Sequence, residues 1–209
     1  MQFWHVSDHY LMIAMRFSFI EVFMEYLEIR DQEGNPTGII KERSKIHEDG
    51  DLHGTSHVFI ARRNPDHSVD LLLQKRAMDK DSYPGCYDIS SAGHIPAGQD
   101  YLKSALRELK EELGITISAE ELHYLGIHRG YSENIFYDKM FKNNEVSKVY
   151  LITKTISIPD LSLQKEEIDS VKWMNLDQTI QAVRDRNPNY CLFEDELLMV
   201  KKAMETLTK

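Results

Sequence analysis

Three glutamates fall within five residues of the stretch RELKEELG, which spans residues 107–114. The cluster comprises Glu108, Glu111 and Glu112, and Arg107 directly precedes it. Neighbouring carboxylates repel one another unless water screens them or a cation binds them. Mg²⁺ prefers oxygen ligands and usually binds the phosphate oxygens of a substrate as well. These residue types predict either a metal site for a phosphorylated substrate or a solvated acidic helix face.

Helical geometry places the three carboxylates on one ridge. Successive residues of an α-helix turn by about 100°, so side chains three and four positions apart are neighbours. The apolar residues of the segment follow helical spacing: Leu102, Ala105, Leu106, Leu109 and Leu113. Gly114 is a typical residue at a helix end. We therefore expect an amphipathic helix from about Asp100 to Leu113, with the carboxylates beside its buried face.

The wider spacing resembles the signature of the Nudix family. That signature has a glycine, five residues, an acid, seven residues, and then Arg-Glu-aliphatic-x-Glu-Glu-x-Gly-aliphatic. The matching residues are Gly93, Arg107, Glu108, Leu109, Glu111, Glu112, Gly114 and Ile115. One position departs, because Gln99 stands where the family usually has glutamate, followed by Asp100. The match favours the metal site over the solvated helix face.

The resemblance implies a pyrophosphohydrolase that uses Mg²⁺ or Mn²⁺ and attacks phosphorus with water. It implies that Glu108, Glu111, Glu112 and the carbonyl of Gly93 would be the metal ligands. One of Glu111 and Glu112 could instead orient or deprotonate the water. Such a metal neutralises charge on phosphate oxygens and lowers the pKa of bound water.

Arg107 is also given a role by the resemblance. In the family this arginine usually pairs with the acid that Gln99 replaces here, and the pair fixes the loop on the helix. Gln99 carries no charge, so we expect Arg107 to pair with Glu111, one turn on, or with Asp100. We expect this departure to weaken loop anchoring more than metal binding.

Nudix enzymes often recruit a base from a later loop. Glu167, with Glu166 beside it, precedes a predicted strand, and Glu133 is a further candidate. We predict Glu167 as a catalytic residue, although acids before a last strand are more often surface charges.

Basic residues before the helix are candidates for substrate binding. Lys75 and Arg76 end a predicted strand that points to the catalytic loop. We expect them, together with His94, to contact a small diphosphate substrate. The alternative is that the two basic residues are solvated strand ends.

The stretch LLLQKRAMDKDSYPGCYDISSAGH, residues 71–94, looks like one branch of the fold. It is similar to isopentenyl diphosphate isomerases, in which a catalytic cysteine directly precedes the Gly-His pair. Ala92 stands at that position here and has no acidic or nucleophilic group. We therefore expect a hydrolase of the isomerase-like branch and keep an isopentenyl diphosphate isomerase as the alternative.

Two further points stay open. His47, His53 and His94 occupy the positions at which those isomerases keep a metal-binding set, so they form either a second metal site or a group of polar turn residues. The chain could also be a nucleotide-binding sensor without catalysis, but the complete glutamate ridge favours turnover. The identity of the diphosphate is not readable from the sequence.

The composition excludes some classes of partner. The chain has 209 residues, 34 acids against 25 bases, and a formal net charge of −9. An acidic chain does not attract a nucleic-acid polymer non-specifically. The two cysteines, Cys86 and Cys191, lie far apart without CxxC spacing. They are typical of reduced thiols in a cytoplasmic protein.

Residues 1–23 differ in character from the rest of the chain. Arg16 and Glu21 interrupt their apolar run, which makes it too short and too charged for a membrane span. The segment also lacks the features of a secretory signal. We interpret it as an N-terminal extension outside the native domain, with an amphipathic helix or a partner-binding segment as alternatives. Residues 24–209 are expected to form one Nudix domain with a core at about 50–185.

The remaining pattern predicts a mixed sheet flanked by helices. Strands are expected over residues 24–30, 55–63, 69–76, 121–131, 147–158 and 171–176, and helices over 175–186 and 193–207. Residues 31–38 and 47–54 are expected to be turns. This α/β pattern matches the α/β/α sandwich that the Nudix resemblance implies. The apolar residues of 193–207 could support a homodimer or pack on the chain's own sheet.

Overall fold

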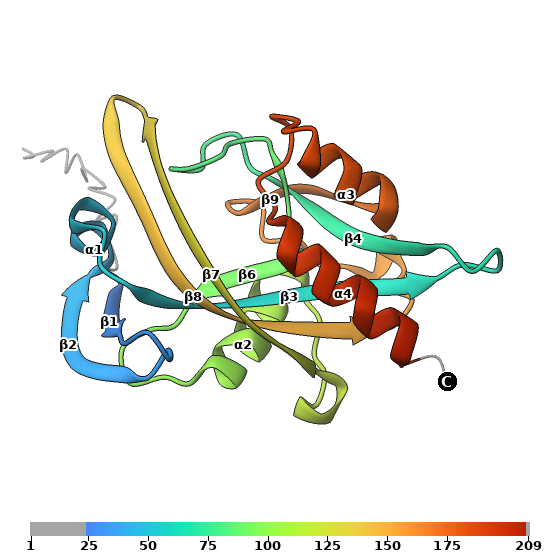
Figure 1. Ribbon diagram of the computed structural model, residues 1–209, viewed down its shortest axis with the longest axis horizontal. Coiled ribbons are helices and arrows are strands. Elements are labelled where there is room, and N and C mark those ends of the chain that lie inside the picture. The colour runs from blue at the N-terminus through green and yellow to red at the C-terminus, as the bar shows by residue number, and fades with distance from the viewer. Residues whose placement is uncertain (1–23, 208–209) are drawn as a thin grey trace, which may run out of the picture.

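The computed structural model describes residues 24–207. A nine-stranded mixed sheet forms its centre, and β3 (His53–Arg63) is the strand with the most neighbours. β3 runs parallel to β8 (Lys139–Thr153) and antiparallel to β1 (Tyr26–Arg30), β4 (Val69–Arg76) and β6 (Ser91–His94). Figure 1 shows β3 running across the middle of the molecule. The sheet thus places β3 and β6 side by side, which matters for the site.

The other elements complete the sheet and cover it. The remaining strands are β2 (Pro36–Glu42), β5 (Tyr87–Asp88), β7 (His123–Phe136) and β9 (Ile168–Asn175). The helices are α1 (Arg43–Asp49), α2 (Tyr101–Leu113), α3 (Leu176–Arg184) and α4 (Glu194–Thr206). Two 3₁₀ turns, Ala119–Glu121 and Ile158–Asp160, lie in connections.

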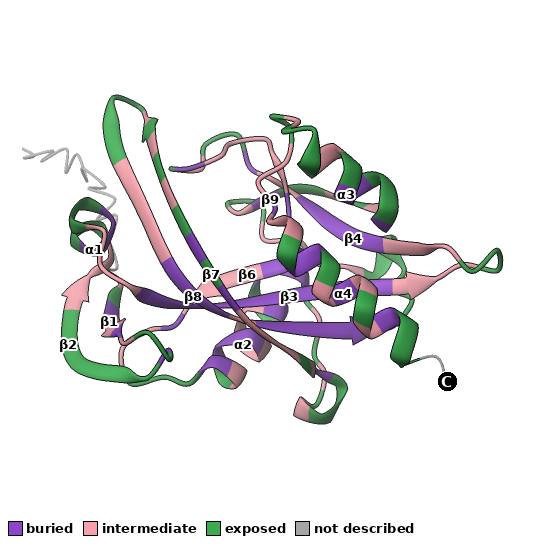
Figure 2. Cartoon of the chain, viewed as in Figure 1, coloured by how far each residue is buried: buried purple, intermediate pink, exposed green. Residues whose placement is uncertain are grey.

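Two apolar cores lie on opposite faces of the sheet. Side chains alternate between faces along a strand, and β3 sends Phe59 into the core under α3 and α4, whereas Val58 and Ile60 enter the core under α2. Residues 53–61 of β3 are therefore buried without interruption, as expected for a strand covered on both sides. Figure 2 shows this buried centre. The α/β/α sandwich expected from the sequence is confirmed.

The helix that carries the glutamates begins and ends where the sequence predicts. Asp100 is the N-cap, and its side chain accepts a hydrogen bond from the Lys103 backbone N–H. Gly114 ends the helix with φ of 72°, a conformation that glycine adopts without steric cost. All five predicted apolar residues pack into the core on this face of the sheet.

Some elements differ from expectation. The supposed turn at 31–38 leads into β2 from Pro36, and the supposed turn at 47–54 contains the end of α1 and the start of β3. The strands expected at 121–131 and 147–158 extend towards each other as the long β7–β8 hairpin, which projects from the body of the molecule in Figure 1. Its tip, Tyr137 and Asp138, has positive φ at both residues, as a tight two-residue hairpin turn requires.

The C-terminal helix packs on the chain's own sheet. Leu197, Val200 and Met204 of α4 are buried in the core with α3. The apolar face that could have supported a dimer is therefore occupied within the chain, while Leu198 is exposed. The interpretation of residues 1–23 lies outside the described residues. Among residues 24–207 we find no helix long and apolar enough to cross a membrane.

Candidate active site

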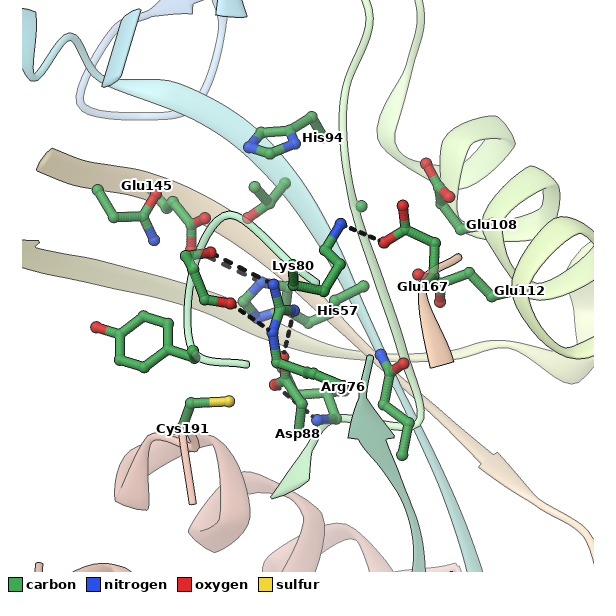
Figure 3. Close-up of a pocket in the computed structure, with 18 of the residues that line it drawn as sticks. His57, Arg76, Lys80, Asp88, His94, Glu108, Glu112, Glu145, Glu167 and Cys191 are labelled. Atoms are coloured by element: carbon green, nitrogen blue, oxygen red, sulfur yellow. Dashed lines mark hydrogen bonds and ion pairs between the residues drawn. The ribbon is translucent and has the colours of Figure 1, made fainter. Parts of the chain in front are cut away.

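A cavity of about 510 Å³ opens beside the glutamate helix. Its walls come from α2, β3, β6 and β8, from the loop that follows β4, and from the segment between α3 and α4. Figure 3 shows Glu108 and Glu112 on one side of this cavity and Cys191 at the other end. The volume lies within the range for small-molecule sites.

All three ridge glutamates line this cavity. Glu112 is 5% exposed, and its Oε2 is buried with no hydrogen-bond partner in the described residues. Burial raises the pKa of Glu112 to about 8, and the carboxylates of Glu108 and Glu167 add to the effect. Burial likewise raises the pKa of Glu108 to about 7, although Arg107 opposes it. Buried carboxylates held this close need a cation or a proton.

The backbone of β6 approaches the ridge closely at Gly93. A Cβ at this position would lie 2.2 Å from Glu108 Oε1, so any other residue here would force the Glu108 carboxylate to move. Gly93 also lines the cavity, so its backbone and the Glu108 carboxylate share one space. The glycine of the signature is thus required by this close approach.

Arg107 pairs within the helix. Its guanidinium donates to Glu111 Oε2 at 2.7 Å and to Glu108 Oε1 at 2.6 Å. The expected pair with Glu111 is confirmed, whereas Asp100 serves as the helix cap and lies 3.4 Å from the Lys103 amine. With Gln99 uncharged, the arginine holds two ridge carboxylates.

Only one of the three candidates for a distant base lines the cavity. Glu167 lines the cavity and forms an ion pair with Lys80 at 2.5 Å, next to Glu108 and Glu112 (Figure 3). Glu166 and Glu133 do not line the cavity, and Glu133 lies on the projecting hairpin. Sequence reasoning does not single out Lys80, because it is one of several charged residues in a polar loop.

The two predicted basic contacts are placed differently. Arg76 lines the cavity, where its guanidinium donates to Asp88 Oδ2 at 3.0 Å and to the Ser82 carbonyl at 3.0 Å. Lys75, the preceding residue of β4, is not among the cavity-lining residues. Successive strand residues point to opposite faces, so only one of the two can reach the cavity.

Three histidines meet at one side of the cavity. We call His47, His53 and His94 the histidine cluster; their ligand atoms lie within 4.8 Å of one another. Strand register brings His94 opposite Thr55, two residues from His53 on the same face of β3. His47 comes from α1 and stacks on Phe141.

The orientation of these rings is fixed by the backbone. His47 Nδ1 lies 3.2 Å from the Lys142 carbonyl and His53 Nδ1 lies 3.0 Å from the Asp51 carbonyl. A carbonyl only accepts, so each Nδ1 carries the proton. The Nε2 atoms of the cluster are buried and have no hydrogen-bond partner in the described residues, although Glu145 Oε1 lies 4.0 Å from His53 Nε2. Burial lowers the pKa of His47 to about 4, that of His53 to about 3, and that of His94 well below its usual value.

A separate buried histidine links the cavity to α4. His57 lines the cavity, and its Nδ1 lies 2.7 Å from Glu196 Oε1, while its Nε2 lies 3.8 Å from Glu145 Oε2. Burial by itself would lower the pKa of His57, but the two carboxylates outweigh it and raise the pKa to about 9. No local spacing connects His57 with Glu196, so the sequence gives no signal for this pair.

Comparison with known proteins agrees with this geometry. The NUDIX domain model matches residues 54–195. The chain is 38% identical to Nudix hydrolase 3 of Arabidopsis thaliana over 172 residues, which cover 81% of this chain and 22% of that protein. It is 34% identical to a Nudix hydrolase of Clostridium acetobutylicum over 154 residues, 74% of this chain and 71% of that protein. The chain therefore spans only about a fifth of the length of the Arabidopsis relative.

The isomerase-like stretch also has a counterpart. An isopentenyl-diphosphate Delta-isomerase of Photorhabdus laumondii is 28% identical over 155 residues, 73% of this chain and 78% of that protein. The structure also superposes on the crystal structure of the protein DR0079 from Deinococcus radiodurans, with a TM-score of 0.59 and 16% sequence identity. The match covers 77% of this chain and 90% of that one, and it shows that the two proteins share a fold. The family model, these relatives and the glutamate ridge against Gly93 lead to one conclusion: this chain belongs to the Nudix family.

Proposed function

We propose that the chain is a metal-dependent pyrophosphohydrolase that cleaves the diphosphate linkage of a small molecule by attack of water on phosphorus. The observation that carries the proposal is the carboxylate ridge of α2 inside the cavity. Glu112 Oε2 is buried there with no partner in the described residues, and Glu108 touches the backbone at Gly93. A chain that only needed a solvated helix would not bury these oxygens.

The donor set fits a hard divalent cation. Glu108, Glu111 and Glu112 supply carboxylate oxygens and Gly93 supplies a carbonyl oxygen, which are the ligand types that Mg²⁺ and Mn²⁺ accept. Bound there, the cation would neutralise charge on the phosphate oxygens and acidify a water. Glu111 has a half-exposed side chain, whereas Glu112 is buried. Glu111 is therefore the ridge member best able to exchange between Arg107, metal and water.

The chain's own residues prepare the reaction around that site. Arg107 holds Glu108 and Glu111 in place, and Lys80 holds Glu167 in the cavity. Transfer of the Lys80 contact from Glu167 to a substrate phosphate would free Glu167 to accept a proton from the attacking water. The ion pair with Asp88 fixes the Arg76 guanidinium in the wall of the cavity, where its positive charge would attract the diphosphate. His94, a member of the histidine cluster, lines the same cavity and is the cluster residue that directly follows Gly93.

The cavity lacks the catalytic cysteine that the isomerase alternative needs. Ala92 is the cavity-lining residue directly before Gly93 and His94, and a methyl group cannot protonate an alkene. The sensor alternative is disfavoured because every ridge carboxylate is present and reaches the cavity. Hydrolysis is the reaction that the available groups support.

The histidine cluster supports a second metal site in the same cavity. Its Nδ1 atoms on His47 and His53 are bound to backbone carbonyls, the arrangement that usually orients metal-binding imidazoles. Three neutral imidazoles with unpartnered Nε2 atoms suit Zn²⁺ or Mn²⁺.

For the domain organisation, the location and the class of substrate, our proposals are the same as the expectations from the sequence. We propose a single domain over residues 24–209, a cytoplasmic location, and a small-molecule substrate in place of a nucleic-acid polymer. A homodimer, if formed, would use a surface other than the buried face of α4.

The decisive experiment is an activity panel with the purified chain in millimolar Mg²⁺. Release of phosphate or pyrophosphate is measured with nucleoside di- and triphosphates, nucleotide sugars, dinucleotides and isopentenyl diphosphate. Glu112→Gln should lower the rate at least about 100-fold. Glu166→Gln is the matched control and should keep full activity, because Glu166 is exposed and lies outside the cavity. Metal and nucleotide binding without turnover of any compound would favour the sensor instead.

A further inference from the structure

Two segments that are distant in sequence pair beside the cavity. Tyr87 of β5 forms a parallel bridge with Tyr190, which lies between α3 and α4. The Tyr87 N–H donates to the Asn189 carbonyl at 2.7 Å, and the Cys191 N–H donates to the Tyr87 carbonyl at 3.0 Å. Cys86 immediately precedes Tyr87, so this pairing brings the chain's only two cysteines together.

Each thiol lies against the other cysteine's segment. Cys86 Sγ donates to the Pro188 carbonyl at 3.4 Å, and Cys191 Sγ donates to the Tyr87 carbonyl at 3.4 Å. The two thiols lie close enough to shift each other's pKa, and both are free. Because short backbone hydrogen bonds fix both segments, the sulfur atoms are held as neighbours without a covalent bond.

The two thiols differ in character. The interaction between the two thiols lowers the pKa of Cys86 to about 7 and raises the pKa of Cys191 well above its ordinary value, and burial adds to the rise at Cys191. Cys86 is partly exposed, and Cys191 lines the cavity. A partly ionised, accessible thiol is the one that reacts with oxidants, and a second thiol beside it can condense with the resulting sulfenic acid.

We propose that Cys86 and Cys191 are a modification site at which hydrogen peroxide forms a reversible intramolecular disulfide. The Cys86 thiolate attacks one peroxide oxygen, the O–O bond breaks, and Cys86 becomes a sulfenic acid while hydroxide leaves and takes a proton to give water. Cys191 sulfur then attacks the Cys86 sulfur, the S–O bond breaks, and a second water leaves with the Cys191 proton. The peroxide is reduced by two electrons, and two thiols are oxidised to one disulfide.

The bond would connect two walls of the cavity. The Cys86 carbonyl accepts a hydrogen bond from the Arg76 N–H at 3.0 Å, at the base of the loop that carries Lys80. Cys191 stands between Tyr190 and Phe193, which also line the cavity. Oxidation would therefore tie the Lys80 loop to the segment that leads into α4. This inference does not depend on the reaction that the cavity performs.

The test is oxidation of the full-length chain with hydrogen peroxide, followed by thiol counting, intact mass and peptide mapping under non-reducing conditions. We expect two free thiols before treatment and none after it, a peptide pair joined through Cys86 and Cys191, and full recovery with dithiothreitol. Thermal unfolding should occur at a higher temperature in the oxidised form, because a cross-link restricts the unfolded chain. Two thiols that persist after treatment, or Cys86 oxidised to sulfinic acid with Cys191 still free, would overturn the proposal.

Two single variants separate the roles of the thiols. Cys191→Ser should stop at the Cys86 sulfenic acid, which dimedone labels. Cys86→Ser should leave Cys191 unlabelled under the same conditions, because burial keeps the Cys191 thiol protonated. Equal labelling of the two variants would contradict the assigned order of reaction, and disulfide-linked dimers of either variant would show that accessibility alone governs oxidation.

Discussion

Two clusters of side chains of the types that bind metals lie at the cavity, and they are built in opposite ways. The glutamate ridge comes from one helix and the glycine just before it, so a contiguous stretch of sequence specifies it. The histidine cluster comes from α1, β3 and β6 and exists only because these elements meet. Helical spacing is enough to recognise the ridge, whereas the histidine cluster is predicted only through the resemblance to the isomerases, because no local period links its three members.

Burial also acts on the two clusters in opposite directions. It raises the pKa of Glu108 and Glu112 and lowers the pKa of the histidines, because desolvation disfavours the charged form of each. The ridge therefore gains most from a hard cation that compensates its charge. The histidine cluster is already neutral and offers nitrogen lone pairs to a borderline metal. The difference predicts two metal sites with separable preferences.

Gly93→Ala should have a large effect on the ridge. The new Cβ would occupy the position of Glu108 Oε1 and displace that carboxylate. A misplacement of about 1 Å can reduce activity about 100-fold, and we expect a loss of that order in diphosphate hydrolysis. Ala97→Ser, in the following loop, should change activity little. Normal turnover in Gly93→Ala would show that Glu108 is not part of the reacting site.

His53→Leu should remove one metal site and leave the other. Calorimetric titration with Zn²⁺ or Mn²⁺ is expected to show at least about tenfold weaker binding at the histidine cluster. Glu112→Gln should weaken the Mg²⁺ site and leave the histidine site unchanged. His67→Asn, in the β3–β4 loop, is the histidine control. Identical titrations for His53→Leu and the unsubstituted chain would reduce the cluster to a structural contact.

The buried pair of His57 and Glu196 predicts how stability depends on pH. The pKa of His57 is about 9 in the folded chain against an ordinary 6.5, with Glu196, Glu145 and Asp88 facing the ring. The folded state therefore binds more protons between these values. The stabilisation is fully present below pH 6.5 and is lost as the pH rises through 9.

Glu196→Gln tests this dependence. Loss of one partner of a buried ion pair costs about 3 kcal/mol in the free energy of unfolding, measured with urea at about pH 6. The decline in stability between pH 6.5 and 9 should become shallower in the variant. Lys201→Ala removes an exposed ion pair with Asp177 and should change stability by less than about 1 kcal/mol. Parallel pH profiles of Glu196→Gln and the unsubstituted chain would contradict the assigned charge on His57.

Gln99→Glu should have the smallest effect. Arg107 already pairs with Glu108 and Glu111, so an added acid would gain a partly exposed contact worth no more than about 1 kcal/mol. We expect activity to stay the same or rise by no more than about fivefold. A large loss would show that Gln99 does not occupy the position of the family's acid.

The accuracy of the sequence predictions depends on the range of the interactions involved. Helix α2 agrees with prediction because its apolar period, its Asp100 cap and its Gly114 stop are all local. Strands β3, β4 and β9 agree with the short apolar runs that predict them. Helix α1 and strand β2 differ from the predicted turns because both are seven residues long and polar on most sides, so packing decides their structure.

The amino-acid sequence alone specifies the ridge, its glycine and the departure at Gln99, because helical spacing fixes which side chains are neighbours. The tertiary structure selects the distant groups that join them. The β3–β6 register brings His94 beside His53, the loop after β4 brings Lys80 to Glu167, and the bridge at Tyr87 brings Cys86 to Cys191. Each of these contacts depends on strand pairing and chain crossing, and these leave no period in the sequence.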